Sequence, residues 1–167
     1  MELDRRELEK AMQVGADCVI EVPTFGPNKF ADLSPFLTAN EVEEQVLVAE
    51  LKQLADDVKR TGVTLLLEPC NKNETHFLRS QEQGANLIGR VGSPGFKLLS
   101  DFYHMQIEER NIRETLTRVG NLTGYVHLAD GVKRTEPESP EMPTNGIHDA
   151  GKRDGSPASG MWRRWSL

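Results

Sequence analysis

Four short apolar runs recur along the chain, and a segment with helical spacing separates each run from the next. The runs are residues 17–23, 64–69, 96–101 and 124–130. Their apolar residues stand at successive positions rather than at alternate ones, which is typical of strands that are buried on both faces. Strands of this kind, alternating with helices, favour a parallel sheet covered by helices.

The spacing of apolar residues between the runs predicts helices over residues 3–14, 41–60, 79–91 and 108–119. Asn40 is the expected N-cap of the second helix, and Gly62 lies just past its end. The first helix is expected to bury a side that carries Leu8, Ala11 and Met12. This alternation leaves a barrel or an open doubly wound sheet. No glycine-rich phosphate loop follows the first run, which disfavours a dinucleotide-binding fold.

Length limits the barrel alternative. The chain has 167 residues, whereas a complete eight-stranded α/β barrel takes roughly 250. We therefore expect residues 1–134 to form a partial (β/α)8 barrel, with about four parallel strands and their covering helices. Residues 135–167 lack apolar periodicity and are rich in Pro, Gly and Ser, which predicts a disordered C-terminal tail. Four strands would leave open sheet edges, so we expect a weakly stable or inactive chain.

The net charge and the cysteine content of the chain indicate which binding partners and which cellular compartment to expect. The net charge of −6 disfavours a phosphate-neutralising surface and hence nucleic acid as a partner. Cys18 and Cys70 have no metal-binding or redox spacing, and we expect buried free thiols in a reducing, cytoplasmic setting. The chain opens on charged residues, and no apolar stretch approaches the roughly 20 residues of a membrane helix.

Three of the apolar runs end near a residue that could bind a metal ion, namely Glu68, Asp101 and His127. In a parallel α/β barrel the C-terminal ends of all strands open onto one face, so these side chains are expected to converge. Two carboxylates and one imidazole suit Mn²⁺, Mg²⁺ or Co²⁺ better than a structural zinc, which favours thiolates. The competing interpretation is two solvated carboxylates and a hydrogen-bonded interior histidine.

The residues around these three positions resemble the motifs of a known enzyme family. Residues 67–78, LEPCNKNETHFL, resemble the Glu-Pro-x-Asn-x-x-Glu-Thr signature of xylose-isomerase-like sugar isomerases and epimerases. This group includes D-tagatose/D-psicose 3-epimerases and hydroxypyruvate isomerases. Residues 97–105 resemble its Asp-x-x-His-Met motif, and residues 126–130 its Val-His-x-x-Asp/Glu strand. The resemblance covers roughly residues 5–134. It is specific for the superfamily and weaker for the substrate.

The resemblance implies roles for individual residues. It makes Glu68, Asp101 and His127 ligands of a divalent metal ion, Mn²⁺, Mg²⁺ or Co²⁺. Glu68 would also be one of two catalytic carboxylates. The residues implied to bind a small sugar substrate are Glu74, His104 and, where the family usually has an Arg, Lys133 and Arg134. The alternative for Glu74 is a solvated carboxylate in the first turn of a helix. The alternative for His104 is a loop residue that caps the following helix.

The implied reaction is isomerisation or epimerisation of a ketose-type sugar through an enediolate. A carboxylate removes the proton from the carbon beside the carbonyl. An isomerase returns the proton to the adjacent carbon, whereas an epimerase uses a second carboxylate on the opposite face. In the family that second group is a Glu from the last strand, which also ligates the metal. We expect no counterpart after Asp130, and no counterpart of the first three barrel strands. A homo-oligomer is a further expectation.

Three other interpretations remain open. The chain could be a non-catalytic fragment that retains a partial metal site. It could be an apurinic endonuclease, because these enzymes share the barrel. Endonucleases of that kind need more His ligands and a basic groove, and the acidic net charge counts against them. The motifs also admit a dehydratase acting on cyclitols, and they leave open which sugar and which carbon react.

Overall fold

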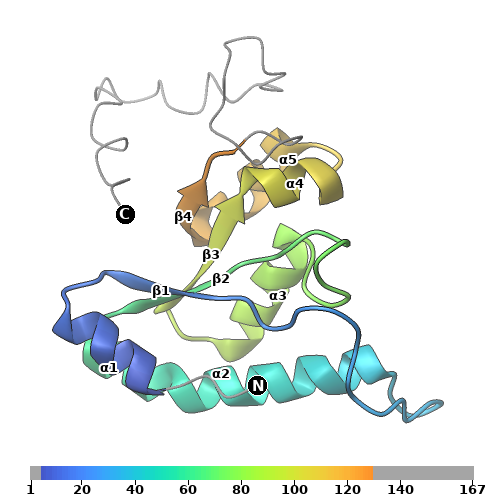
Figure 1. Cartoon of the computed structure of the whole chain (residues 1–167), viewed down its shortest axis with the longest axis horizontal. Helices are drawn as coiled ribbons and strands as arrows, with labels where there is room; N and C mark the ends of the chain where they lie inside the picture. The colour runs from blue at the N-terminus through green and yellow to red at the C-terminus, as the bar shows by residue number, and fades with distance from the viewer. Residues whose placement is uncertain (1–4, 130–167) are drawn as a thin grey trace.

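A four-stranded parallel sheet, in the order β1-β2-β3-β4, is the framework of the molecule (Figure 1). The computed structural model describes residues 5–129. Each strand pairs with the next one in the sequence, so every connection crosses to the neighbouring strand. The predicted parallel α/β architecture is therefore confirmed. The strands are β1 (Cys18–Glu21), β2 (Thr64–Leu67), β3 (Phe96–Asp101) and β4 (Thr123–His127).

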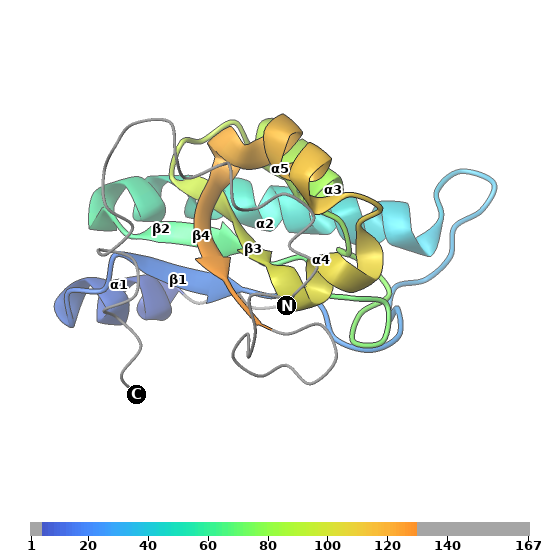
Figure 2. The same cartoon turned by 90° about the horizontal axis from the view of Figure 1, so that it is seen from above.

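The helices contact one another in chain order, α1 with α2, α2 with α3, and α3 with α5. Seen from above, α2, α3 and α5 lie on the same side of the strands (Figure 2). This arrangement covers one face of the sheet and leaves the other as the face that a barrel would enclose. The helices are α1 (Arg5–Gln13), α2 (Ala39–Thr61), α3 (Gln81–Val91), α4 (Phe102–Glu108), α5 (Ile112–Val119) and the short 3₁₀ helix η1 (Gly120–Leu122).

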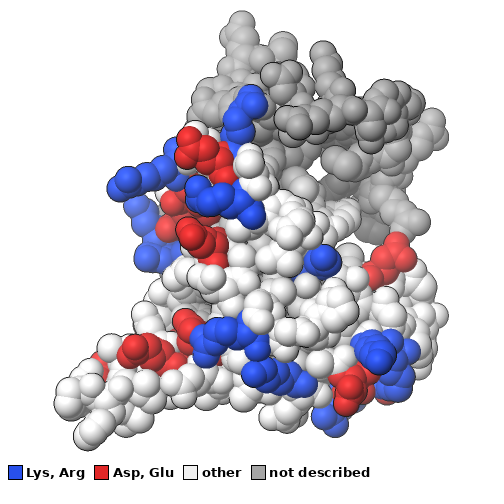
Figure 3. All heavy atoms as spheres, turned by 180° about the vertical axis from the view of Figure 1, so that it is seen from behind, with Lys and Arg blue, Asp and Glu red and all other residues white. Residues whose placement is uncertain are grey.

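Basic and acidic side chains are intermingled on the face of the molecule drawn in Figure 3. Ion pairs join the helices to one another. Arg60 of α2 lies 3.0 Å from Glu9 of α1, and Arg90 of α3 pairs with Glu44 of α2. Exposed pairs of this kind contribute about 0–1 kcal/mol each, so they orient the helices more than they stabilise them.

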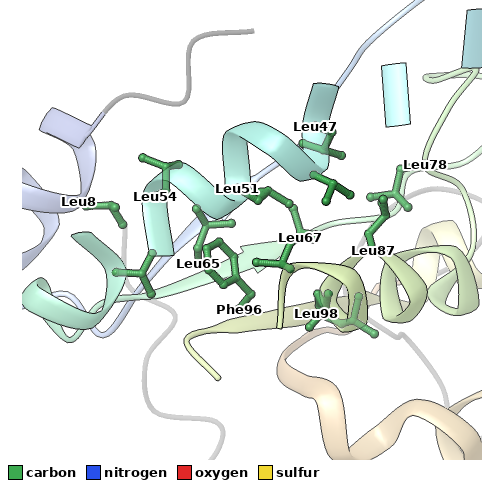
Figure 4. Packing of buried hydrophobic residues seen from close by; sticks show 14 of the residues in the cluster. Leu8, Leu47, Leu51, Leu54, Leu65, Leu67, Leu78, Leu87, Phe96 and Leu98 are labelled. Atoms are coloured by element: carbon green, nitrogen blue, oxygen red, sulfur yellow. The ribbon is translucent and has the colours of Figure 1, made fainter. Parts of the chain in front are cut away.

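The main core lies between the helices and the sheet (Figure 4). Alternate residues of β2 and β3 point toward the helices, because side chains alternate along a strand. Full burial of one such leucine contributes about 2 kcal/mol. The labelled core residues are Leu8, Leu47, Leu51, Leu54, Leu65, Leu67, Leu78, Leu87, Phe96 and Leu98. The same alternation sends Glu68 and Asp101 to the opposite face of the sheet.

The predicted N-cap of α2 is wrong. Thr38 caps the helix, because its side chain accepts from the Glu41 amide and the Glu41 side chain accepts from the Thr38 amide. This reciprocal capping box satisfies two amides that would otherwise lack partners at the helix start. Asn40 instead accepts a hydrogen bond from Asn28 in the preceding loop. The predicted end of α2 is confirmed, with Gly62 in the left-handed region at φ 70°.

The predicted helix over residues 108–119 corresponds to α5, which begins later, at Ile112, and a further helix that the sequence analysis did not predict, α4, ends at Glu108. Two helices therefore follow β3. The first, α4, begins directly after β3, where the Asp101 side chain accepts from the Tyr103 amide and caps it. The second, α5, is capped by Asn111. The intervening residues let the chain turn between them. His104 accordingly lies inside α4 and not in a loop.

Burial differs from expectation at the N-terminal edge. Strand β1 was expected to be buried, but Ile20 is 43% exposed and Cys18 is half-buried. Met12 is likewise exposed. The reason is position, because β1 has a single neighbouring strand in the described sheet. Cys70 is buried as predicted.

Among residues 5–129, no helix combines the length and apolarity needed to cross a bilayer. The predicted tail over residues 135–167 lies outside the described residues.

Candidate metal centre

The three predicted strand-end residues converge. Glu68 follows β2, Asp101 ends β3 and His127 ends β4, so they come from three neighbouring strands. One ligand atom from each lies within 4.8 Å of the others. Glu68 and Asp101 are buried, and His127 is partly buried. Their spacing matches the sequence expectation, whereas metal binding itself stays a prediction.

A one-residue irregularity brings His127 to this face of the sheet. The pairing of β3 with β4 shifts between Leu98 and Leu99, so that Leu98 pairs with Thr123 and Leu99 with Tyr125. Gly124 is the extra residue of this bulge. Regular pairing from Thr123 onward would turn His127 toward the helices, because strand side chains alternate. With the bulge, His127 pairs with Asp101 on the site face.

Asp101 is held in its ionised form. Burial opposes the charge, but hydrogen bonding from His127 and from the Tyr103 amide outweighs it, and the pKa of Asp101 falls below its ordinary value. The Tyr103 amide nitrogen lies 2.8 Å from Oδ1, and His127 Nδ1 lies 3.5 Å from Oδ2. An anionic oxygen that accepts such donors is a suitable ligand for a divalent cation.

Glu68 also belongs to a second group, with Cys70 and His104. All three residues are buried, and their ligand atoms again lie within 4.8 Å of one another. His104 Nε2 is 3.6 Å from Glu68 Oε1, and His104 Nδ1 is 4.0 Å from Glu74 Oε1. Of the four residues implied to bind substrate, His104 therefore lies beside Glu68, and Glu74 lies beside His104. The other two, Lys133 and Arg134, lie outside the described residues.

Asn71 connects these side chains, and the sequence analysis assigned it no role. It is fully buried. Its amide nitrogen and its side-chain nitrogen both approach His104 Nδ1, and the side chain also donates to Glu74. The available signal was the Asn of the Glu-Pro-x-Asn signature, which stands two residues after the Glu-Pro pair at positions 68–69.

A second polar link anchors the loop that follows β1. The buried Glu43 of α2 accepts a hydrogen bond from Thr24 at 2.6 Å and lies 2.5 Å from His76 Nε2. The other ring nitrogen of His76 lies 2.6 Å from the carbonyl oxygen of Gly26. His76 therefore has a structural role in holding this loop against α2. Its partners lie 33 and 50 positions away, so the sequence held no local signal for them.

Comparison with known proteins identifies the family. The family model described as xylose isomerase-like TIM barrel matches residues 2–160. The chain belongs to the xylose isomerase-like TIM barrel family. The curated relatives described below have the names of a sugar epimerase and of a hydroxypyruvate isomerase. Because the matched region includes residues 67–105, the resemblance of those motifs to the family is confirmed.

This xylose isomerase-like chain is similar to several curated proteins. It is 29% identical over 127 residues to 3-dehydro-D-guloside 4-epimerase of Escherichia coli, which covers 75% of this chain and 48% of that protein. It is 34% identical over 100 residues to a Danio rerio protein with the provisional name hydroxypyruvate isomerase, covering 58% of this chain and 36% of that protein. The chain thus spans a third to a half of these relatives.

A solved structure shows the same fold. The apo form of 3-keto-D-glucoside 4-epimerase from E. coli superimposes with a TM-score of 0.66 at 28% identity, covering 76% of this chain and 49% of that chain. D-psicose 3-epimerase, crystallised in the presence of D-fructose, superimposes with a TM-score of 0.65 at 23% identity, covering 75% of this chain and 43% of that chain. The second likeness supports the fold alone.

Proposed function

We propose that this protein acts in the metal-dependent isomerisation or epimerisation of ketose-type sugars through an enediolate. The observation that carries the proposal is the convergence of Glu68, Asp101 and His127 within 4.8 Å at three adjacent strand ends. The family and the sugar-epimerase names of its relatives supply the substrate class.

The donor set fits a divalent cation. Two carboxylates and one imidazole give the mixed oxygen and nitrogen set that suits Mn²⁺, Mg²⁺ or Co²⁺. Each ligand atom lies about 2.0–2.6 Å from such an ion, so atoms within 4.8 Å of one another reach a common ion with small side-chain movements. When bound, the ion polarises the ketose carbonyl and its neighbouring hydroxyl.

The side chains of the site then have distinct tasks. The Glu68 carboxylate takes the proton from the carbon beside the carbonyl, the C–H electron pair forms the C=C bond of the enediolate, and the C=O π pair moves to the carbonyl oxygen. In an isomerase Glu68 returns this proton to the former carbonyl carbon, while the hydroxyl proton of the neighbouring carbon passes to the former carbonyl oxygen. In an epimerase a second acid returns a proton to the same carbon from the opposite face. Glu74 and His104 hydrogen-bond to substrate oxygens beside Glu68.

Hydrogen exchange with solvent tests this chemistry directly. The full chain is incubated in D₂O with Mn²⁺ and D-psicose, L-ribulose or hydroxypyruvate, and deuterium at the carbon beside the carbonyl is measured by mass spectrometry. We expect incorporation by the wild-type chain and its loss in Glu68→Gln. The matched control is Glu82→Gln at an exposed position of α3. Absence of both Mn²⁺ binding and exchange in the wild-type chain contradicts the proposal.

A non-catalytic metal-binding fragment is the second candidate, because the chain spans at most 48% of the curated relatives described above. Isothermal titration with Mn²⁺ separates the two. Binding without deuterium exchange for any of the three substrates favours the fragment. Binding with exchange favours the enzyme.

Other superfamily chemistries fit less well. An AP endonuclease from Brucella melitensis shares the fold, with a TM-score of 0.61 at 20% identity, covering 85% of this chain and 55% of that chain. The candidate site within residues 5–129 offers one histidine, His127, beside two carboxylates, and the face in Figure 3 intermingles both charge signs. Nicking of abasic plasmid DNA would support the nuclease. A cyclitol dehydratase remains compatible with the motifs.

Two further expectations belong to this proposal. The described sheet ends at β1 and β4, and unpaired strand edges favour association, so we propose a homo-oligomer. Analytical ultracentrifugation of the full chain measures this. A cytoplasmic location stays a prediction, as does the binding of substrate by Lys133 and Arg134.

A further inference from the structure

We infer that Asn71 is a positioning residue that fixes the His104 ring with its proton on Nε2, so that His104 serves the site as a hydrogen-bond donor and not as a metal ligand. The inference deepens the proposed function and rests on it for the task of Glu68. It separates the two groups of ligand-type side chains that share Glu68.

The hydrogen bonds of Asn71 determine the tautomer of His104. The main-chain amide of Asn71 donates to His104 Nδ1 at 3.1 Å. An amide N–H has no acceptor capacity, so Nδ1 must be the unprotonated nitrogen. Its side-chain nitrogen lies 2.8 Å from the same ring atom. The neutral ring therefore carries its proton on Nε2.

The side-chain amide of Asn71 is itself held in one orientation. Its Oδ1 accepts from the Asn73 amide at 2.9 Å, and its Nδ2 donates to Glu74 Oε1 at 3.1 Å. Exchange of the two amide atoms would place an acceptor against the carboxylate and a donor against an N–H. Asn71 and His104 are 0% and 1% exposed, so water does not supply alternative partners.

This tautomer excludes one metal set. A neutral histidine that ligates a metal through Nε2 carries its proton on Nδ1. The Asn71 amide already points at that nitrogen. The group of Glu68, Cys70 and His104 therefore cannot take a metal without losing a buried hydrogen bond, whereas the group of Glu68, Asp101 and His127 is under no such restriction.

The same tautomer gives His104 a task. Nε2 lies 3.6 Å from Glu68 Oε1, so its proton is beside the carboxylate that we propose as the base, and we propose that it donates to a substrate oxygen bound next to that carboxylate. An uncharged N–H that is held in place before substrate arrives stabilises negative charge as it develops on that oxygen. Asn71 acts through His104 and is not expected to touch the substrate.

NMR of the ¹⁵N-labelled full chain tests the tautomer without any turnover. Long-range ¹H–¹⁵N correlations assign the His104 ring by comparison with His104→Gln. We expect an unprotonated Nδ1 and a protonated Nε2, both before and after addition of Zn²⁺ as a diamagnetic probe. The His127 signals should move on Zn²⁺ addition. Protonation of Nδ1, or Zn²⁺ coordination by His104, overturns the inference, whereas absence of deuterium exchange counts against the proposed function alone.

A pair of charge-matched variants tests the role of Asn71. Asn71→Asp replaces the donor 2.8 Å from Nδ1 with an acceptor, which should draw a proton onto Nδ1 and lower the deuterium-exchange rate at least tenfold. Asn73→Asp adds the same charge at an exposed position two residues away and should leave both unchanged. Mn²⁺ affinity should stay within threefold in both. Equal effects of the two variants, or an unchanged tautomer in Asn71→Asp, would show that the Asn71 side chain does not position the ring.

Discussion

Glu21 ends β1 with its carboxyl group among other acids on the helix-covered face. Burial, together with the nearby charges of Glu7 on α1 and Glu50 on α2, raises the pKa of Glu21 to about 7. The pKa of Glu50 is itself raised by burial. The folded protein thus holds a proton on Glu21 at a pH where the unfolded chain, with a glutamate pKa of about 4.3, has released it.

The first prediction follows from this proton. The folded state binds more protons than the unfolded state between about pH 4.5 and 7, so its stability falls as pH rises through that window. Glu21→Gln removes the penalty at high pH. We expect it to raise the free energy of unfolding by about 1 kcal/mol at pH 8, a figure reduced for partial exposure, and to leave it unchanged at pH 5. Urea denaturation at the two pH values measures this; an equal effect at both would be contrary.

Individual site residues differed in how far the sequence could predict them. Glu68 and Asp101 were predictable, because an apolar run that stops at a carboxylate marks a strand end. The place of His104 within α4 was not, since that helix has 7 residues and depends on a cap from Asp101. Asn71 belongs to a motif that the sequence analysis quoted, but its contact with the His104 ring, 33 positions away, could not be predicted from the sequence.

At the scale of elements, α3 packs against the sheet at Gly84. A Cβ atom added there would lie 2.6 Å from Leu98 Cδ2 of β3, below any normal contact. Leu98 is fully buried and cannot move aside. Gly89 belongs to the same helix, and a Cβ atom at that position would meet nothing within 4 Å. Close packing against β3 therefore requires glycine at position 84, whereas packing places no such requirement on position 89.

The second prediction compares them. Gly84→Ala gains helix propensity but overpacks the core, so we expect it to lower the free energy of unfolding by about 1–2 kcal/mol. Gly89→Ala gains the propensity alone and should raise it by about 0.5–1 kcal/mol. Chemical denaturation of both variants beside the wild type measures the difference. Stabilisation by both substitutions would show that α3 can shift away from β3.

The third prediction concerns the bulge of β4. A Cβ atom at Gly124 would lie 2.7 Å from Lys97 Cβ and 2.8 Å from Leu66 Cδ2. We expect Gly124→Ala to distort the pairing of β4, with a loss of about 1–3 kcal/mol and at least tenfold weaker Mn²⁺ binding. Calorimetric titration measures the affinity, with Gly89→Ala as control. Unchanged Mn²⁺ affinity would mean that His127 does not depend on the bulge.

At the scale of the whole molecule, the proposed ion would join side chains from the ends of three neighbouring strands. Ligands that bind the folded state alone stabilise it by mass action. This gives the fourth prediction. Mn²⁺ at a hundred times its dissociation constant should raise the free energy of unfolding by about 2.7 kcal/mol. Asp101→Asn should abolish that increment. A wild-type chain whose stability does not respond to Mn²⁺ would argue against the centre.

The parallel, helix-covered sheet of residues 5–129 could be predicted, because each apolar run was followed by a helical pattern, and such connections favour parallel strands. Features that depend on pairing between elements could not. The bulge opposite Leu98, the link between Glu43 and His76, and the exposure of Ile20 at an edge all depend on contacts between residues that are far apart in the sequence. The predicted weak stability of the isolated chain stays a prediction.

Because side chains alternate along a strand, the number of residues in β4 before His127 decides which face of the sheet its imidazole reaches. A chimera that takes residues 123–127 from a relative with regular pairing would keep an imidazole at the strand end, but this imidazole would point into the core beneath the helices. Insertion of one residue before the imidazole would return it to the site face, whereas insertion of two would turn it toward the core again. Grafting experiments between members of this family must therefore match strand length before they match ligands.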